Sequence, residues 1–340
     1  MTTSVVGLDL PALQDYLTTH VPGVGRLHAE LISGGRSNLT YRLTDGRSRL
    51  VLRRPPLGGL TPSAHDMARE YTVVAALRGS GVPVAGAVVL CEDPAVIGAP
   101  FAVVEHVDGR VLRSQTELDT LSQADVRRCA FALVDVLARL HAVDPAAVGL
   151  AGFGRPEGYL SRQVRRWRDQ WNRVATRSLA DVDALYARLA ESCPPESGAS
   201  IVHGDFRIDN AILDTDDAGV VRALVDWEMA TLGDPLADLG LHLVYADPVF
   251  DPVLGGAAAS TSPRLPTADE LVSRYAALSG RDVSGLSFHV GLGYFKAAVI
   301  AEGINARRIA GKTVGEGFDV VGEAVAPLAA AGLAALPDRS

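Results

Sequence analysis

The sequence has few cysteines, and their spacing suits neither a disulfide framework nor a metal knuckle. Among 340 residues there are three, Cys91, Cys129 and Cys193, which are widely spaced and odd in number. Small disulfide-stabilised domains carry an even and dense set, and zinc knuckles carry Cys-x-x-Cys pairs. We therefore predict that all three are buried structural thiols in a reducing cytoplasm.

The sequence also lacks an excess of basic residues. It contains 32 Lys and Arg against 40 Asp and Glu, a formal net charge of -8. Binding to a nucleic-acid backbone requires a basic face, so nucleic acid is not expected as the main partner. A nucleotide is not excluded, because a loop, a cation and one or two basic side chains handle its phosphates locally.

No stretch of the sequence resembles a membrane span or a secretion signal. The N-terminal residues MTTSVVGLDLPALQDYL lack a basic start and a long apolar core. The most apolar late run, AVAPLAAAGLAAL, is too short to cross a bilayer and contains Pro327. With 48% hydrophobic and 21% charged residues, the composition is that of an ordinary globular protein. We predict a cytoplasmic protein without a membrane partner; its oligomeric state is not indicated.

The first part of the chain is rich in short strand-like segments. Two of them, TYRL and LVLRR, flank a tight turn at Asp45–Gly46. A helix with apolar residues at spacings of three and four follows, from Met67 to Leu77, and two further strands come after it. The pattern predicts an N-terminal antiparallel β lobe over residues 1–104 with one inserted helix, and a hinge over residues 105–110.

The rest of the chain is mainly helical. Ser122 and Asp125 have the spacing of a helix start, and residues 158–193 form a second helical region. Short strands surround residues 200–227, and helices resume from about Leu236. Residues 111–340 are therefore predicted to form a larger helical lobe, which makes the fold class α+β with two lobes. Ligands usually bind in a cleft between two such lobes.

One polar cluster, HGDFRIDN at residues 203–210, lies between apolar flanks. Asp205 and Asn210 lie five residues apart, and Asp226 follows at the end of a later strand-like run. Carboxylate and amide oxygens suit Mg²⁺, which also binds substrate phosphates. If Asn210 and Asp226 hold the metal, Asp205 is left to accept a proton from a hydroxyl nucleophile. Arg207 is then placed to offset charge on a transferring phosphoryl group.

Other interpretations of this cluster stay open on the residues alone. An isolated Asp-x₄-Asn is often a turn stabilised by side-chain hydrogen bonds. His203 can be a metal ligand, but we interpret it as structural, because no second histidine stands at ligand spacing. A metal-dependent hydrolase that uses His203 and Asp205 is disfavoured, because no further His or Asp ligands cluster nearby in the sequence.

Two motifs together carry a family resemblance. HGDFRIDN followed by VDWEMATLGDPLADLG resembles the aminoglycoside phosphotransferase and choline kinase-like superfamily, whose fold is similar to that of protein kinases. Within it, the sequence is similar to bacterial phosphotransferases related to the kinase-like domain that is fused to some acyl-CoA dehydrogenases. The resemblance runs from SGGRSNLTYRL to the helical end of the chain, and the order and spacing of the two motifs make it specific.

The resemblance implies a role for each matching position. Asp205 corresponds to the catalytic base, and Asn210 and Asp226 to the two Mg²⁺ ligands. Glu70 corresponds to the acid that pairs with the phosphate-binding residue of the third strand, and Asp238 to a buried acid that supports the catalytic loop. The nucleotide-binding positions comprise a small-residue loop and a hinge whose backbone binds adenine: Ser33, Gly34, Gly35, Ser37 and Asn38, then Glu105, His106 and Val107.

The sequence departs from the family pattern at two places. The usual lysine of the third strand is replaced by Arg53, and Arg54 follows it; strand alternation lets only one of them face the nucleotide. Arginine can bind phosphate through two nitrogens, so activity need not be lost. Trp227 and Glu228 follow Asp226 where protein kinases have Phe-Gly, so a flipping activation loop is not expected.

The resulting expectation is an ATP- or GTP-dependent, Mg²⁺-dependent O-phosphotransferase that acts on the hydroxyl of a small molecule. We favour a metabolic hydroxy-acid or hydroxyacyl acceptor; an aminoglycoside kinase is the alternative, and a nucleotide-binding pseudokinase acting as sensor or scaffold is the alternative from another class. Several side chains of the helical lobe can line an acceptor pocket or simply pack helices: Arg162, Arg165, Arg166, Lys296, Trp167, Trp171, Tyr245 and Tyr294. Four acids there fit a pocket for a polycationic aminoglycoside, but they fit solvated helix ends and turns equally well: Asp247, Asp251, Asp269 and Glu270.

Overall fold

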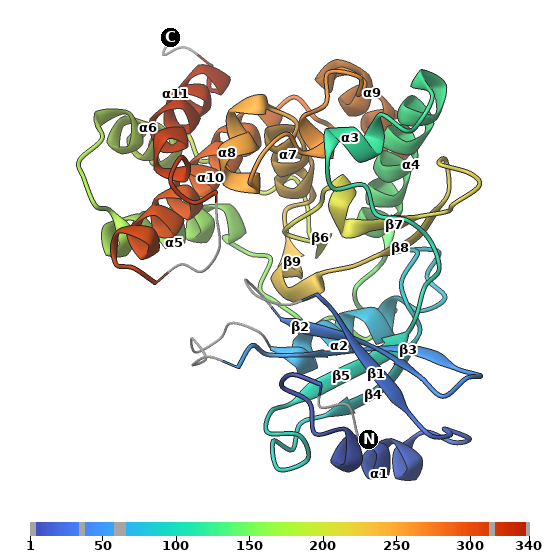
Figure 1. Cartoon of the computed structure of the whole chain (residues 1–340). Helices are drawn as coiled ribbons and strands as arrows, with labels where there is room; N and C mark the ends of the chain where they lie inside the picture. The colour runs from blue at the N-terminus through green and yellow to red at the C-terminus, as the bar shows by residue number, and fades with distance from the viewer. Residues whose placement is uncertain (1–4, 34–37, 58–65, 313–316, 338–340) are drawn as a thin grey trace. The chain divides into compact units, whose positions relative to one another are not determined.

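The computed structural model describes residues 5–33, 38–57, 66–312 and 317–337. The chain divides into two compact units (Figure 1). The first comprises Met1–Asp108 and Ala223–Glu228, and the second comprises Gly109–Arg222 and Met229–Ser340. The division at Asp108 lies inside the segment predicted as the hinge, and the strand end that carries Asp226 belongs to the first unit.

The first unit is built on a five-stranded antiparallel sheet with strand order β1-β2-β3-β5-β4. The turn at Gly46, with φ of 85°, connects β2 to β3 as predicted. The strands are β1 (His28–Ser33), β2 (Leu39–Thr44), β3 (Arg49–Arg54), β4 (Ala87–Cys91) and β5 (Phe101–Glu105).

Buried and more exposed residues alternate along β2 and β3, so the two faces of this sheet differ. Leu39, Tyr41 and Leu43 are buried on one face and pack with helix α1 (Leu10–His20), which the sequence analysis did not predict. The sequence contains a signal for the start of α1, because Asp9 is a residue type that commonly caps helices. In the structure Asp9 accepts a hydrogen bond from the Ala12 backbone N–H at 3.1 Å. Helix α2 (Met67–Leu77), the predicted inserted helix, packs against β4 and β5.

The second unit is mostly helical, as predicted (Figure 1). Its helix α4 begins at Ser122, whose hydroxyl accepts from the Asp125 backbone N–H at 3.1 Å. The predicted helical region 158–193 consists of two helices, α5 and α6. The α-helices of this unit are α3 (Gln115–Leu118), α4 (Gln123–Ala142), α5 (Tyr159–Val174), α6 (Ala180–Glu191), α7 (Pro235–Tyr245), α8 (Asp251–Leu254), α9 (Ala268–Ser279), α10 (Leu286–Ile309) and α11 (Val325–Ala335).

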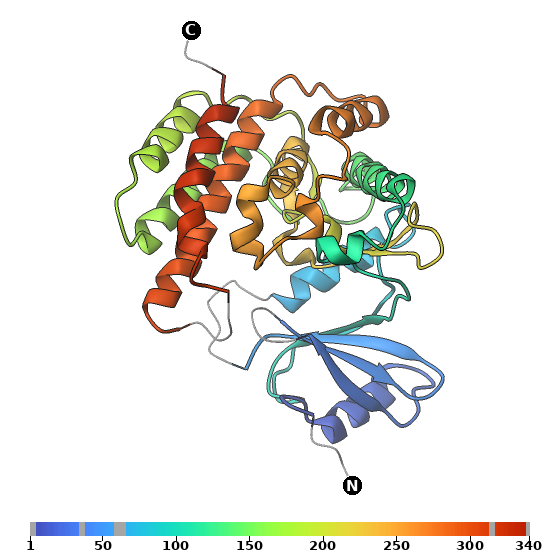
Figure 2. The same cartoon turned by 45° about the horizontal axis from the view of Figure 1, so that its top comes forward.

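The core of the second unit forms around α10. Helices α5, α6, α7 and α11 all pack on it, and Figure 2 shows α10 and α11 running side by side. Phe295, Ala298 and Ala301 of α10 are fully buried in this core. None of the helices in the described ranges combines the length and the apolar character that crossing a bilayer requires.

Two small sheets position the polar loops of the second unit. Strand β6 (Ser200–Val202) pairs antiparallel with β9 (Thr231–Gly233). Strand β7 (Ala211–Leu213) pairs with β8 (Val221–Leu224), so both ends of the segment 203–210 are held by strands. Short 3₁₀ turns complete the unit: Ile208–Asn210, Pro248–Phe250, Ala259–Thr261 and Val321–Ala324. A further 3₁₀ turn, Trp227–Met229, begins with the last two residues of the first unit.

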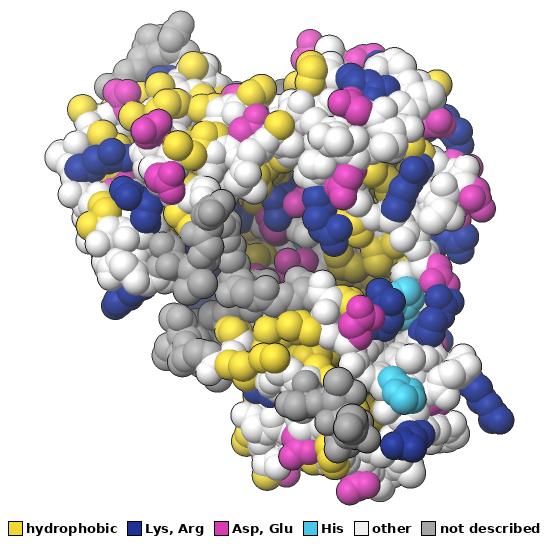
Figure 3. Space-filling model, viewed as in Figure 1, with side chains coloured by type: hydrophobic (Ala, Val, Ile, Leu, Met, Phe, Trp, Pro, Cys, Tyr) yellow, Lys and Arg dark blue, Asp and Glu magenta, His cyan; other side chains and the backbone are white. Residues whose placement is uncertain are grey.

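The three cysteines are free thiols, and charged side chains of both signs lie on the surface. Cys91 and Cys129 are buried free thiols, but Cys193 is partly exposed, so the prediction of three buried thiols was wrong for that residue. Cys193 lies just beyond the end of α6, where the chain returns to the surface. On the face shown in Figure 3, acidic and basic side chains are interspersed.

Candidate active site

The loop after β6 is held in place by Asp238 at the start of α7. Its two carboxylate oxygens accept hydrogen bonds from the backbone N–H groups of His203 (2.6 Å) and Gly204 (2.8 Å). His141 Nε2 lies 3.3 Å from the same carboxylate, which is almost completely buried. The predicted supporting role of Asp238 is confirmed by these contacts.

Gly204 occupies a position where a side chain does not fit. Its φ is 80°, in the left-handed region, and a Cβ atom there would lie 2.6 Å from the Met229 carbonyl oxygen. The close approach of these two backbones brings the start of the loop against Met229, the last residue of the turn Trp227–Met229. Glycine is required here by both conformation and space.

We therefore expect Gly204→Ala to lower the free energy of unfolding by about 1–3 kcal/mol, the usual cost of a strained backbone position. Urea unfolding measures this loss. Gly280→Ala is a matched control, because Gly280 has φ of 66° but no neighbouring atom within 4 Å of an added Cβ. Equal losses for the two variants would show that the Met229 contact contributes nothing.

His203 is fully buried directly before the glycine. Its ring nitrogen Nδ1 accepts a hydrogen bond from the Asp205 backbone N–H at 3.3 Å, and the ring meets Phe206 edge to face at 6.0 Å between centroids. These contacts agree with the interpretation of His203 as a residue that shapes the loop.

The Asp205 carboxylate is surrounded by donors from two segments, the end of α7 and the turn at residues 207–210. The Tyr245 hydroxyl, at the end of α7, donates to Oδ1. The Asn210 amide donates to Oδ2 at 2.9 Å and to the Asp205 backbone carbonyl at 2.8 Å. Arg207 Nε lies 3.5 Å from Oδ2, and its guanidinium stacks over the Tyr245 ring at 5.4 Å. The carboxylate orientation is therefore fixed from both of its oxygens.

The electrostatic surroundings keep Asp205 ionised. Burial raises the pKa of this carboxyl, but the charges of Arg207 and Lys296 and the Tyr245 hydroxyl outweigh burial, so the pKa lies below its ordinary value. The group is consequently a carboxylate at neutral pH, which is the form that can accept a proton.

Asn210 ends a short 3₁₀ turn, Ile208–Asn210, that follows Arg207. In both of its side-chain hydrogen bonds the amide nitrogen is the donor. The side-chain oxygen is left available for a cation, which is the role that the resemblance implies. Arg207 also contacts Asp209, with Nη1 3.1 Å from Oδ2.

In the first unit, Arg53 of β3 meets two acids. It forms an ion pair with Glu70 of α2, and its Nη2 lies 3.1 Å from Asp226 Oδ1. The neighbouring Arg54 faces the other side of the sheet, where Nη1 donates to the carbonyls of Gly7 and Ile97, the latter at 3.0 Å. Arg53 and Arg54 thus face opposite sides of the sheet, as strand alternation predicted, and Arg53 is the one that pairs with Glu70.

Asp226 has an unusual backbone conformation. Its φ of 65° is the single positive φ among the non-glycine residues that the structure describes. A non-glycine residue is held in this region at a cost, and such positions are concentrated at functional sites. One carboxylate oxygen contacts Arg53, and 29% of the side chain is exposed, so oxygen remains accessible to a metal ion.

The Arg53–Glu70 pair predicts a pH dependence. Burial raises the pKa of Glu70 from 4.5 to about 6, although Arg53 opposes the rise. The folded protein therefore keeps this proton to a higher pH than the unfolded chain does. The contribution of Glu70 to stability accordingly falls as pH rises from 4.5 to about 6, and is constant above that value.

Below about pH 6 the protonated Glu70 no longer pairs with Arg53 as an anion. We expect the affinity for ATP to fall as the pH drops through this value, measured by isothermal titration calorimetry between pH 5 and pH 8. Nucleotide phosphates titrate in a similar range, so Glu70→Gln supplies the baseline. Identical pH profiles for the two proteins would contradict the coupling.

The predicted hinge and loop positions differ in what the structure describes. The backbone N–H of Glu105 donates to Gly86 O (2.7 Å) and that of His106 to Arg49 O (3.0 Å), so both serve strand pairing. Among the described residues, the Val107 N–H donates to no backbone carbonyl, which leaves it for a ligand.

The nucleotide-covering loop lies largely outside the described residues. Gly34, Gly35 and Ser37 belong to the undescribed segment, and of Ser33 only its place at the end of β1 is described. Asn38 is buried, and its side-chain oxygen and nitrogen have no hydrogen-bond partner in the described part of the chain. A buried amide without partners is costly, so it is a candidate ligand contact.

Few of the side chains proposed for an acceptor pocket come together. Trp167 and Lys296 line one cavity, and Tyr245 binds Asp205. Arg166 is exposed and lies over the Trp167 ring, 5.9 Å from its centre. The others are engaged elsewhere: Arg162 binds backbone carbonyls, Arg165 is exposed, and Trp171 and Tyr294 pack in the helical core.

Two residues of that cavity, Tyr159 and Gln163, were missed by the sequence analysis. The available signal was their spacing to Trp167, at successive steps of four along one helix.

The sequence is similar to known proteins over most of its length. The family model described as "Phosphotransferase enzyme family" matches residues 28–271. Acyl-CoA dehydrogenase family member 11 of Gallus gallus is 37% identical over 337 residues, which cover 96% of this chain and 43% of that relative. The chain therefore spans less than half the length of this relative.

Solved structures show the same fold. A structure from Ralstonia eutropha JMP134, described provisionally as an aminoglycoside phosphotransferase, is 33% identical with a TM-score of 0.83, and covers 96% of this chain and 98% of its own. A thermostable aminoglycoside phosphotransferase mutant in complex with ADP and hygromycin B has a TM-score of 0.63 at 14% identity, and covers 95% and 98%. The protein kinase-like fold predicted from the motifs is confirmed, and the chain belongs to the phosphotransferase enzyme family.

Proposed function

We propose that this protein transfers the γ-phosphoryl group of ATP or GTP to a hydroxyl group of a small molecule, with a metabolic hydroxy-acid or hydroxyacyl compound as acceptor. The observation that carries the proposal is the Asp205 carboxylate, which is ionised and is oriented by Tyr245, Asn210 and Arg207. An oriented carboxylate of low pKa is what a phosphotransferase needs to align a hydroxyl nucleophile.

In the proposed step, the acceptor hydroxyl displaces the nucleoside diphosphate from the γ-phosphorus. The acceptor oxygen forms a bond to the γ-phosphorus, the bond from that phosphorus to the β,γ-bridging oxygen breaks, and the nucleoside diphosphate leaves. The proton of the acceptor hydroxyl passes to an oxygen of Asp205, which holds it until release to solvent. Arg207 offsets negative charge on the transferring group, and Arg53 offsets charge on the nucleotide phosphates.

Asn210 and Asp226 fit a magnesium ion by their chemistry. The Asn210 amide oxygen takes no part in the side chain's two hydrogen bonds, and Asp226 presents an accessible carboxylate in a strained backbone position. We propose that these two residues hold Mg²⁺, which neutralises phosphate charge when bound. The nucleotide loop and hinge positions, including Asn38, Arg53, Glu70 and Val107, are proposed to bind the nucleotide; a structural neighbour was solved with ADP.

The choice of a metabolic acceptor over an aminoglycoside rests on the state of the acids in the helical unit. Polycationic antibiotics need acids that are free to pair with them. Asp247 accepts from Val249 N–H (2.9 Å) and the Tyr294 hydroxyl (2.6 Å), and Asp251 accepts from the Thr261 hydroxyl (2.6 Å). Glu270 forms a capping box with Thr267 at the start of α9. These acids serve turns and helix ends.

Acceptor-dependent ADP release tests the proposal. The full chain is incubated with ATP or GTP and Mg²⁺ against hydroxy acids, hydroxyacyl-CoA thioesters, amino alcohols, sugars and aminoglycosides, and products are verified by ³¹P NMR. Release that depends on a hydroxy acid or hydroxyacyl compound is expected. Nucleotide binding without acceptor-dependent release from any class would contradict the proposal and favour the pseudokinase alternative. The cytoplasmic location expected from the sequence stays a prediction.

A further inference from the structure

A small cavity lies in the second unit beside the start of the catalytic loop. It has a volume of about 40 Å³, and Gly204, the residue before Asp205, forms part of its wall. One water molecule needs about 10–15 Å³ of such space, so the cavity can hold a group of about three heavy atoms. Helices α5, α7 and α10 supply the lining: Tyr159, Gln163, Trp167, Ala237, Asp238, Leu241, His289, Leu292, Gly293 and Lys296.

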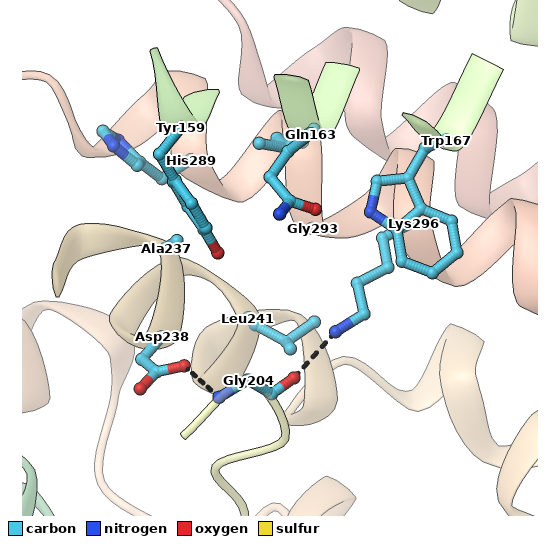
Figure 4. Close-up of a pocket in the computed structure, with 11 residues that line it drawn as sticks. Tyr159, Gln163, Trp167, Gly204, Ala237, Asp238, Leu241, His289, Gly293 and Lys296 are labelled. Atoms are coloured by element: carbon cyan, nitrogen blue, oxygen red, sulfur yellow. Dashed lines mark hydrogen bonds between the residues drawn. The ribbon is translucent and has the colours of Figure 1, made fainter. Parts of the chain in front are cut away.

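The polar groups turned toward this space are mainly hydrogen-bond donors. Figure 4 shows the Tyr159 hydroxyl, the Gln163 amide and the Lys296 ammonium around it. Tyr159 is 8% exposed, yet its hydroxyl has no hydrogen-bond partner among the described residues. The hydroxyl is therefore available to a ligand or a water in the cavity.

Lys296 adds positive charge to the cavity. Its Nζ donates to the Gly204 carbonyl at 2.7 Å and lies 5.7 Å from the centre of the Trp167 ring, so two of its three hydrogens remain for other acceptors. Burial lowers the pKa of Lys296, against the charges of Asp205 and Asp238, so a bound anion would offset the desolvation of the ammonium.

The carboxylate of Asp238, which also lines the cavity, offsets part of this charge. Both oxygens of Asp238 already accept hydrogen bonds, from His203 N–H, Gly204 N–H and His141. The remaining lining from Leu241, Leu292 and Gly293 is apolar and holds no competing acceptor side chain. The cavity thus joins a cation, a hydroxyl and an amide on a largely apolar base, a combination that selects a small anion.

We propose that this cavity binds the carboxylate group of the phosphoryl acceptor, with Lys296, Tyr159 and Gln163 as its contacts. The assignment rests on the proposed function, and it narrows the acceptor to a hydroxy acid with a free carboxylate. Because Gly204 precedes Asp205 directly, a carboxylate held here lies one residue along the chain from the proposed base. The charge of Lys296 also acts on the Asp205 carboxyl, so the cation of the cavity lies near the proposed base.

Binding without nucleotide tests the site separately from catalysis. The probes are 3-hydroxybutyrate and its uncharged methyl ester, titrated into the full chain by calorimetry. We expect the acid to bind at least 10-fold more tightly than the ester. Tyr159→Phe and Gln163→Leu should weaken acid binding about 3- to 10-fold, and Lys296→Met should remove it, each with little change for the ester.

A matched control lies on the same helix. Gln170 of α5 accepts from Arg173 at 2.9 Å and does not line the cavity, so Gln170→Leu should leave acid binding unchanged. Equal affinities for acid and ester, or equal losses in Gln170→Leu and Gln163→Leu, would overturn the inference. Acid binding without phosphoryl transfer to any acceptor would support the site and contradict the proposed function. Phosphoryl transfer confined to uncharged acceptors would support phosphoryl transfer as the function and contradict the carboxylate site.

Discussion

Replacing Asp205 by asparagine is expected to lower the turnover number by roughly 10²–10⁴-fold, the usual contribution of a general base. Asparagine has nearly the same shape, but its single side-chain oxygen can replace only one of the two carboxylate oxygens that face Tyr245 and Arg207, and it cannot take up a proton. Nucleotide affinity should stay within about threefold of wild type, because in the proposed mechanism Asp205 contacts the acceptor. Single-turnover ADP release and nucleotide calorimetry measure the two quantities.

Asp209→Asn provides the matched control for this experiment. Asp209 lies in the same loop and pairs with the same arginine, with its Oδ2 3.1 Å from Arg207 Nη1. The variant removes a neighbouring carboxylate but keeps Asp205, so we expect less than a tenfold loss of turnover. A similar loss in both variants would mean that the loop's total negative charge matters and that Asp205 is not the base.

The second large effect is expected from Asp238→Ala. The change leaves the N–H groups of His203 and Gly204 without their acceptor and removes the partner of the buried His141. Each buried donor left without an acceptor typically costs about 1–3 kcal/mol, so the loss of these two acceptors is expected to lower the free energy of unfolding by about 2–6 kcal/mol. Because the loop start is held by the same carboxylate, turnover should be lost as well, even in the molecules that remain folded.

The sign of the pH dependence follows from the same contacts. Burial raises the pKa of Asp238, but His141 and the backbone donors outweigh it, so the pKa lies below the ordinary 3.8. The stabilisation is therefore present above pH 3.8 and is lost as pH falls through the folded-state pKa.

Asp135→Ala is the control for Asp238→Ala, because it removes a partly exposed ion pair with Arg274 at 2.5 Å. Such surface pairs contribute about 0–1 kcal/mol. Guanidinium unfolding at pH 7 compares the two variants. A loss below about 1 kcal/mol for Asp238→Ala would contradict the supporting role of this residue.

Several features of the fold followed from local patterns. The alternation in TYRL and LVLRR, with Asp45–Gly46 between, predicted the β2–β3 hairpin and the opposite faces of Arg53 and Arg54. The spacing from Met67 to Leu77 predicted α2. Helix α1 was missed although its cap at Asp9 is a local signal, because the segment was considered only as a possible leader.

The assignment of chemistry depended on motifs and not on periodicity. HGDFRIDN and the segment around Asp226 combine polar residues in an order that is specific to one family, so the fold and the phosphotransferase family could be predicted before any contact was known. A further local error concerned Cys193, whose partial exposure depends on where the chain leaves α6.

The sequence alone determined which residue types are available for chemistry, because motif order and local spacing are properties of a single segment. Only the tertiary structure decided which of them meet. Tyr245 contacts Asp205, which is 40 positions away in the sequence. Lys296 contacts Gly204 at a separation of 92 positions, and Arg53 contacts Asp226 at a separation of 173. The packing of α5, α7 and α10 likewise creates the donor-lined cavity at Tyr159 and Gln163. Such contacts depend on how helices and strands pack over the whole unit, and no local pattern encodes that packing.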